Sequence, residues 1–297
     1  MYSKNINPIM TILPTRIIPR LDIKGHNLVK GVKLEGLRVL GDPEIFAEYY
    51  YSSGADELFY QDVVASLYEQ NGLHEIIKKT AKKIFIPLTV GGGIRSINDI
   101  NDVLRSGADK VSINTAAVKN PDFINRAVKQ FGSSTIVVAI EAIKNNLGNY
   151  VVSIDSGREL TNLNVIDWAM RVCELGAGEI FLTSVDHEGT GIGFDNNLIA
   201  NTKKVVDIPV IVHGGCASYQ HVVNTCKETS VNAISCASMF HYPLSNILKS
   251  KFNQEMKIGN RDFLNTNLSF KKFFNTNIQD LKDYMYQNGI IVRQLNE

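Results

Sequence analysis

Apolar segments of seven to nine residues recur along the chain, and polar stretches of helical length separate them. Each segment is nearly continuously apolar, which is typical of parallel strands covered on both faces. Strands that alternate with helices indicate βα units around a parallel sheet. We predict eight strands, at residues 17–23, 57–64, 84–90, 110–116, 135–143, 179–185, 208–214 and 232–238.

Helix boundaries are marked at several points. Asp42-Pro43 and Asn120-Pro121 each place a capping side chain before a proline at the first helical position. The string IQDLKDYMYQNG predicts a last helix that starts at Ile278, with Gly289 just beyond its C-terminal end.

Two pairs of similar strings share one spacing. IPLTVGGGIRS begins at Ile86 and IPVIVHGGCAS at Ile208, whereas GADELF begins at Gly54 and GAGEIF at Gly176. Both offsets are 122 residues (208 − 86 and 176 − 54). Four duplicated βα units give eight, the number that closes a barrel. The sequence predicts an α/β fold, a (β/α)₈ TIM barrel with an internal half-barrel duplication, and an open doubly wound sheet is the alternative.

Length, composition and charge bound the class of protein. The chain has 297 residues, and a barrel of about 250 residues as one domain is ordinary. We expect a single domain over 1–297, with a short extension at 1–14 and an Asn-, Lys- and Phe-rich insertion at about 250–277. The formal net charge is +1, so no overall field favours nucleic acid or an anionic membrane. No apolar run reaches the roughly 18 residues that span a bilayer.

Cysteine usage predicts a cytoplasmic protein with reduced, mostly buried thiols. The four cysteines form no CxxC pair, and the histidines show no zinc spacing. We therefore expect neither a metal nor a cofactor.

Glycine and small polar residues at the ends of strands predict two anion sites. Residues at the C-terminal ends of strands build the active sites of such barrels. Gly92-Gly93 and Asn114-Thr115 follow the third and fourth strands, and Gly214-Gly215 and Ala237-Ser238 follow the seventh and eighth. Glycine lets a backbone N–H approach a phosphate, and a following helix N-terminus attracts the anion. The alternative is that these glycines only form tight turns.

Two carboxyl groups are expected to face each other across the pocket. Asp22 ends the first strand and Glu141 the fifth, which lie opposite each other in an eight-stranded barrel. Such a pair can divide general acid and base roles. The alternative is that the acids form ion pairs with Lys24, Lys30 or Arg95. The segment 25–42 is long for a βα loop, so we expect a mobile lid whose Lys30 closes over a phosphate.

Four charged residues fall at strand starts, at the opposite end of the barrel. Two are basic and two acidic, so they can neutralise one another in a stabilising cluster. They are Arg16, Glu57, Lys110 and Glu179.

Several strings resemble the cyclase subunit of imidazole glycerol phosphate synthase, the HisF family. They are RIIPRLDIKG, TVGGGIRS, GADKVSINTAAV, GAGEIFLTSVDHEGTGIGFD and the closing NGIIVR. The resemblance runs from about Arg16 to His241 and resumes in the last helix. The sister isomerase of histidine biosynthesis shares the barrel and both phosphate sites but lacks these strings.

The resemblance implies a reaction and a partner. Ammonia from a separate HisH-type glutaminase, docked on the N-terminal face of the barrel, attacks the bis-phosphate formimino-AICAR ribulose phosphate substrate and gives imidazole glycerol phosphate and AICAR. The chain has no GxCxG glutaminase elbow of its own. The resemblance assigns catalysis to Asp22 and Glu141, the ammonia gate to Arg16, Glu57, Lys110 and Glu179, and substrate or phosphate binding to Lys24, Lys30, Gly92, Gly93, Asn114, Thr115, Asp186, Gly189, Thr190, Gly214, Gly215, Ala237 and Ser238.

Three departures from the family pattern keep other functions open. Arg20 stands where the family has Cys, and Glu141 and Glu188 stand where it has Asp. With the unusual tail, they raise the alternative of a diverged paralogue that works with a glutaminase and an amidotransferase in amidino-sugar synthesis for surface polysaccharide. A scaffold that only binds and activates a glutaminase is a third hypothesis.

Overall fold

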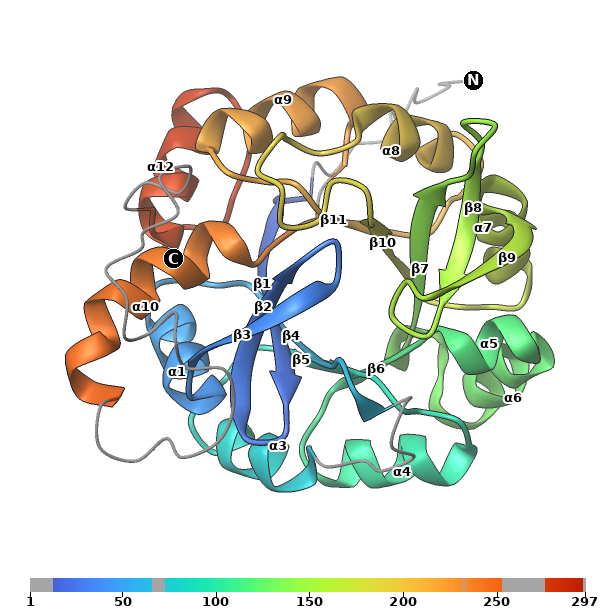
Figure 1. Ribbon diagram of the computed structural model, residues 1–297, viewed down its shortest axis with the longest axis horizontal. Helices are drawn as coiled ribbons and strands as arrows, with labels where there is room; N and C mark the ends of the chain where they lie inside the picture. The colour runs from blue at the N-terminus through green and yellow to red at the C-terminus, as the bar shows by residue number, and fades with distance from the viewer. Residues whose placement is uncertain (1–12, 66–72, 232, 253–275, 296–297) are drawn as a thin grey trace, which may run out of the picture.

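Eight parallel strands close into a barrel in the computed structural model, which describes residues 13–65, 73–231, 233–252 and 276–295 (Figure 1). Strand β12 pairs back onto β1, and β10 pairs with β7, so the sheet has no open edge among these eight strands. Closure rules out the open doubly wound alternative. In order around the barrel, the strands are β1 (Arg16–Lys24), β4 (Leu58–Asp62), β5 (Leu88–Gly91), β6 (Lys110–Ile113), β7 (Ile136–Lys144), β10 (Glu179–Ser184), β11 (Val210–His213) and β12 (Ala233–Cys236).

All eight predicted strands are present, and the repeat appears in the geometry. The bounds of β5 and β11 differ by 122 residues at both ends (210 − 88 and 213 − 91). The glycine pairs after these strands also match, with φ of +99° and +70° at Gly92 and Gly93, and +107° and +97° at Gly214 and Gly215. These conformations are open to glycine and strained for other residues.

Two antiparallel hairpins were not predicted. Strands β2 (Asn27–Val32) and β3 (Glu35–Gly41) follow β1, and β8 (Tyr150–Ile154) and β9 (Glu159–Asn164) follow β7. Both hairpins continue the sheet from the ends of barrel strands, because β2 pairs with β1 and β8 with β7. Most of the segment 25–42, which we expected to be a mobile lid, forms the β2–β3 hairpin, and this hairpin crosses the mouth of the barrel (Figure 1).

Helices surround the strands, and several of them begin after a side chain that accepts from a free N–H group of the first turn. Asp42 accepts from the N–H of Glu44 before Pro43, as predicted. The second signal is displaced, because Asn120 ends one helix and the next begins at Asp122. The helices are α1 (Pro43–Ser52), α3 (His74–Ala81), α4 (Ile97–Arg105), α5 (Thr115–Lys119), α6 (Asp122–Phe131), α7 (Val165–Glu174), α8 (Asn196–Lys203), α9 (Tyr219–Thr229), α10 (Ser238–Phe252) and α12 (Ile278–Gln287), with a short 3₁₀ turn at Ser133–Thr135.

The C-terminal helix is as predicted, and Gly289 follows it with φ of +79°. Lys282 of α12 and Arg293 both reach Asp56, with nitrogen–oxygen distances of 2.8 and 2.9 Å. These contacts tie the end of the chain to the N-terminal side of the barrel. Most of the predicted insertion, residues 253–275, lies outside the described residues, as does most of the predicted N-terminal extension.

Inward-facing residues form layers along the barrel axis, because alternate residues of a strand point to the same side. Charged residues at the strand starts form the first layer. A buried apolar cluster of Ile18, Phe59, Val137, Phe181, Ile211 and Ala233 follows, in which the ring centroids of Phe59 and Phe181 lie 4.1 Å apart. Two residues further along the same strands, the side chains are polar except at Ala139 of β7, and this layer faces the two hairpins.

Among the described residues, no helix is long and apolar enough to cross a membrane. All four cysteines are free, and Cys216, Cys226 and Cys236 are buried.

Candidate active site

Asp22 and Glu141 line one small cavity near the C-terminal end of the barrel. Asp22 lies on β1 and Glu141 on β7, on opposite sides of the eight-stranded ring. The two acids are 2% and 8% exposed. The cavity is about 10 Å³ and is also lined by Arg20, Gln61 and residues of both hairpins. The opposed carboxyl groups therefore share one compartment.

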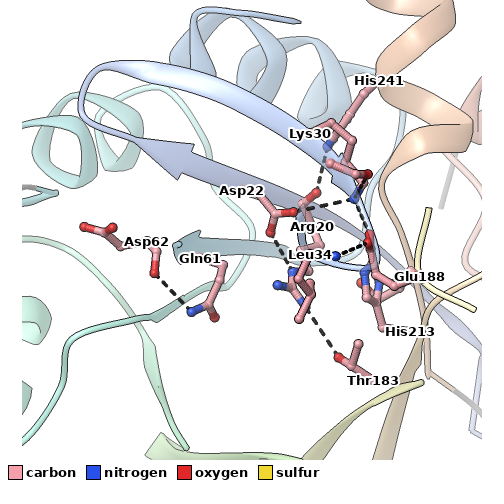
Figure 2. A network of polar contacts seen from close by, with 12 residues as sticks. Arg20, Asp22, Lys30, Leu34, Gln61, Asp62, Thr183, Glu188, His213 and His241 are labelled. Carbon is pink, nitrogen blue, oxygen red and sulfur yellow. Dashed lines mark hydrogen bonds and ion pairs between the residues drawn. The ribbon is translucent and has the colours of Figure 1, made fainter. Parts of the chain in front are cut away.

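Asp22 belongs to a network of buried charges (Figure 2). Arg20 donates from Nε to one carboxylate oxygen at 2.8 Å, and Lys30 Nζ lies 3.7 Å from the other. Lys30 also forms a very short ion pair with Glu188, whose second oxygen accepts from the N–H of Leu34 at 3.2 Å. Burial alone would raise the pKa of Asp22, but the charges of Arg20 and Lys30 outweigh it and lower that pKa.

Glu141 lies in a different environment. Its carboxylate accepts from the N–H of Gly157 at 3.0 Å, and no ion pair joins it to a described cation. Burial raises the pKa of Glu141 to about 7, although Arg20 and the N–H of Gly157 oppose the shift. Two buried cations, Arg20 and Lys30, already balance the carboxylates of Asp22 and Glu188. Glu141 is a third acid without a cation of its own, and near neutral pH it can both hold and release a proton.

His213 adds a neutral polar group to the same network. Its Nδ1 donates to the carbonyl of Ser235 at 3.2 Å, which leaves Nε2 as an acceptor. Among the described residues Nε2 has no hydrogen-bond partner, although it is buried. Burial and the nearby Arg20 and Lys30 hold the pKa of His213 well below its usual range.

We call the first predicted anion site, Gly92, Gly93, Asn114 and Thr115, the first cradle. It borders a cavity of about 250 Å³. This cavity reaches Glu141, so the cradle and one acid share it. Arg95 and Lys119 also line it and add positive charge. The Oδ1 of Asn114 and the Oγ of Ser112 are buried without partners among the described residues, as expected where a ligand would supply them.

The second cradle consists of Gly189, Gly214, Gly215, Ala237 and Ser238. It encloses only about 10 Å³ and shares Glu188 and His213 with the charge network. The Oγ of Ser238, at the start of α10, is buried without a partner in the described structure. Added Cβ atoms at Gly214 and Gly215 would meet carbonyl oxygens at 2.7 and 2.0 Å, so the backbone here has no room for side chains.

Several predicted binding residues lie elsewhere or have other partners. Lys30 is 1% exposed and is paired with Glu188 and Asp22, so its contact with a phosphate stays a prediction. Lys24 is exposed at the turn from β1 to β2 and lines none of the cavities described above. Asp186 accepts from the N–H of Lys144 at 2.9 Å, and Thr190 donates to the carbonyl of His187 at 2.6 Å.

The four charged strand-start residues form a closed ring. Arg16 lies 2.5 Å from both Glu57 and Glu179, and Lys110 lies 3.1 and 2.8 Å from the same two acids. Each acid thus contacts both cations, which neutralises the ring at this end of the barrel.

Sequence reasoning missed two groups of site residues. Arg20 and His213 could have been found, because they face inward by the same alternation that places Ile18, Asp22 and Ile211 inside. Residues 155–157 could not, because the β8–β9 hairpin that brings them over Glu141 was not predicted. Of the proposed ion-pair partners of the acids, Lys30 does contact Asp22.

The barrel fold agrees with the sequence comparison. The sequence model of the family described as "Histidine biosynthesis protein" matches residues 16–245. This range covers more than half of the chain, so the chain belongs to that family.

Individual relatives narrow the assignment. "Imidazole glycerol phosphate synthase subunit HisF" of Legionella pneumophila is 56% identical over 200 residues, which cover 67% of this chain and 94% of the relative. Proteins of the same name from Bacillus cereus (strain G9842) and Alkaliphilus metalliredigens (strain QYMF) are 48% and 44% identical, over 78% and 84% of this chain and 92% and 100% of their own lengths. Within the family, the chain falls in the HisF group.

Proposed function

We propose that the chain is the ammonia-dependent cyclase of imidazole glycerol phosphate synthase. It converts the formimino-AICAR ribulose phosphate substrate to imidazole glycerol phosphate and AICAR in histidine biosynthesis. One observation carries the proposal: Asp22 and Glu141 share a cavity between two cradles suited to phosphate groups, in a barrel of the HisF group. A substrate with a phosphate at each end would place its middle at the acids.

The chemistry of ammonia addition fits the two acids. When ammonia adds to a carbonyl carbon, a proton must reach the oxygen and protons must leave the nitrogen. A carboxyl group with a pKa of about 7, as Glu141 has, is suited to exchange protons near neutral pH. Asp22 stays ionised and stabilises positive charge that develops on the attacking nitrogen.

The purified chain tests this proposal with an ammonium salt and the ribulotide substrate. We expect imidazole glycerol phosphate and AICAR to form in equal amounts. Absence of turnover by a protein with an intact melting transition would contradict the proposal. Rescue of a histidine auxotroph would further support it, and the relatives reported above lend no support to the amidino-sugar alternative.

Ammonia is supplied by a separate glutaminase that docks at the N-terminal end of the barrel. The relatives are named as subunits, which fits a protein that works in a complex. Exposed apolar side chains support this surface: Phe85, which precedes β5, and Leu13, which precedes β1, are 81% and 63% exposed. The charged ring lies in the middle of this end.

Charge reversal at Lys110 tests the docking of the glutaminase and the supply of ammonia separately from the cyclase reaction. Lys110→Glu puts a third acid into the ring, so glutamine-dependent activity with the glutaminase should fall while ammonium-dependent activity persists. Equal loss of both activities would argue that the ring only stabilises the barrel.

A further inference from the structure

Arg20 extends from β1 into the barrel interior, between Asp22 and Thr183 (Figure 2). Its Nη1 lies 3.4 Å from the hydroxyl of Thr183 on β10, and its guanidinium carbon lies 5.6 Å from the centre of the Phe181 ring. Thr183 is the register partner of Glu141, because β10 pairs with β7. The guanidinium therefore reaches from β1, which carries Asp22, toward β10, the neighbour of the strand that carries Glu141.

The backbone at Arg20 is held from outside the barrel. His241 of α10 donates from Nε2 to the carbonyl of Arg20 at 2.8 Å, and the hydroxyl of Tyr50 lies 2.7 Å from the other ring nitrogen. Burial lowers the pKa of His241 to about 4, so the ring is neutral and Nδ1 accepts from Tyr50. Because these contacts hold the backbone at Arg20, the guanidinium extends from a fixed position on β1.

A buried arginine is a permanent charge, because the guanidinium does not lose its proton in proteins. Its side chain is 4% exposed, and that of Asp22 is 3% exposed. Other ionisable groups face the pair from five elements: Lys30 of β2, Glu141 of β7, Glu188 of the β10–α8 connection, His213 of β11 and His241 of α10. Tyr242 of α10 faces Lys30. Asp22 therefore has a fixed cation on one oxygen and a second cation near the other.

We propose that Arg20 is a positioning residue of the reaction, which fixes Asp22 as a carboxylate of constant orientation and leaves proton exchange with the substrate to Glu141. The proposal rests on the proposed function for the reaction itself. The Arg20–Asp22 pair, however, is a property of the folded chain and can be measured without substrate.

The test compares Arg20→Met, which keeps length and removes charge, with Arg20→Lys, which keeps charge and removes the planar fork. Arg126→Met is the matched control, because Arg126 pairs with Asp122 on the exposed face of α6. The Asp22 carboxyl is titrated in the full chain by carbon-13 NMR, with Asp22→Asn to assign its signal. The pH dependence of the ammonium-dependent rate is measured alongside.

We expect Arg20→Met to raise the apparent pKa of Asp22 by about 1–3 units, as removal of an adjacent opposite charge does. Its kcat should fall on the order of 100-fold, as loss of positioning does, with little change in the substrate KM because the cradles remain. Arg20→Lys should keep the low pKa of Asp22. Its kcat should still fall about tenfold, because the lysine ammonium lacks the planar set of donors with which a guanidinium fixes the orientation of a carboxylate. The control should match the wild-type chain in both measurements.

Two results would overturn the proposal. One is an Arg20→Met chain whose Asp22 titration and pH–rate profile are unchanged while only its melting temperature falls. The other is a wild-type kcat in Arg20→Lys, which decides the question even where Arg20→Met does not fold. If the wild-type chain has no cyclase activity, the proposed function fails, and the titration still decides whether Arg20 fixes Asp22.

Discussion

The two half-barrels share a topology but give their acids opposite protonation preferences. Each half begins with a strand that carries an acid near its end, followed by an antiparallel hairpin. The first hairpin places the ammonium group of Lys30 3.7 Å from Asp22, whereas the second brings only the N–H of Gly157 to Glu141, at 3.0 Å. A duplicated fold therefore repeats the positions of the acids. Arg20 of β1 and Lys30 of the first hairpin keep Asp22 ionised, whereas burial favours the protonated form of Glu141.

Asp22→Asn tests the balance of buried charges around the first acid and has the largest expected effect. The change leaves Arg20 and Lys30 buried with Glu188 as their remaining carboxylate, and an unbalanced buried charge costs about 3–5 kcal/mol in the free energy of unfolding. Ammonium-dependent activity should fall on the order of 1,000-fold as well. Denaturant unfolding and steady-state rates measure both effects, and Asp122→Asn on the exposed face of α6 is the matched control. A stability equal to that of the control would show that the network is not balanced as we describe.

Glu141→Gln should separate activity from stability. The amide keeps the shape of the side chain but cannot exchange a proton, so the ammonium-dependent kcat should fall about 10²–10⁴-fold. Because Glu141 has no ion-pair partner among the described residues, the free energy of unfolding near pH 7 should not decrease. Glu159→Gln, on the exposed strand β9 of the neighbouring hairpin, is the control. A kcat within a few-fold of wild type would remove Glu141 from proton transfer.

The opposite pKa shifts give opposite dependences of stability on pH. Burial raises the pKa of Glu141 from 4.5 to about 7, so the folded chain binds this proton more tightly than the unfolded chain. Its contribution is complete below about pH 4.5 and is lost as pH rises through about 7, which amounts to about 3 kcal/mol. The lowered pKa of Asp22 acts in the other direction, so its contribution is lost as pH falls.

The difference in stability between wild type and Glu141→Gln isolates this effect from all other titrating groups. When the free energy of unfolding is measured from pH 5 to pH 9, that of the variant should rise relative to that of the wild type as pH rises. A difference that stays constant over this range would mean that Glu141 titrates with its ordinary pKa.

The barrel was predictable because its strands are buried on both faces and read as continuous apolar runs. The repeat offset of 122 residues then fixed the number of units. The hairpins were missed for a physical reason. NLVKGV and ELTNLN mix apolar and polar residues without a clear alternation, and β9 is mostly exposed. Pairing with the ends of β1 and β7 makes them strands, and such tertiary support leaves little trace in the local pattern.

The site was predictable in its positions and less so in its partners. Strand ends and the repeat located Asp22, Glu141 and both cradles. Lys30 was expected over a phosphate, but its neighbours depend on how the hairpin docks against Glu188, some 158 residues away. Contacts across that separation are set by the fold and are not visible in the sequence around either residue.

A substitution in the second cradle has the smallest expected effect and tests one difference between the two half-barrels. The hydroxyl of Thr115 in the first cradle accepts from the N–H of Asp155 at 3.1 Å, whereas that of Ser238 in the second has no partner among the described residues. Ser238→Ala should therefore leave the free energy of unfolding unchanged and raise the substrate KM about tenfold, which corresponds to about 1.4 kcal/mol for one hydrogen bond to a charged phosphate. Ser52→Ala, at the exposed end of α1, is the control. A loss of stability without a change in KM would mean that the Ser238 hydroxyl serves the fold, and that the mirrored cradle binds no anion through it.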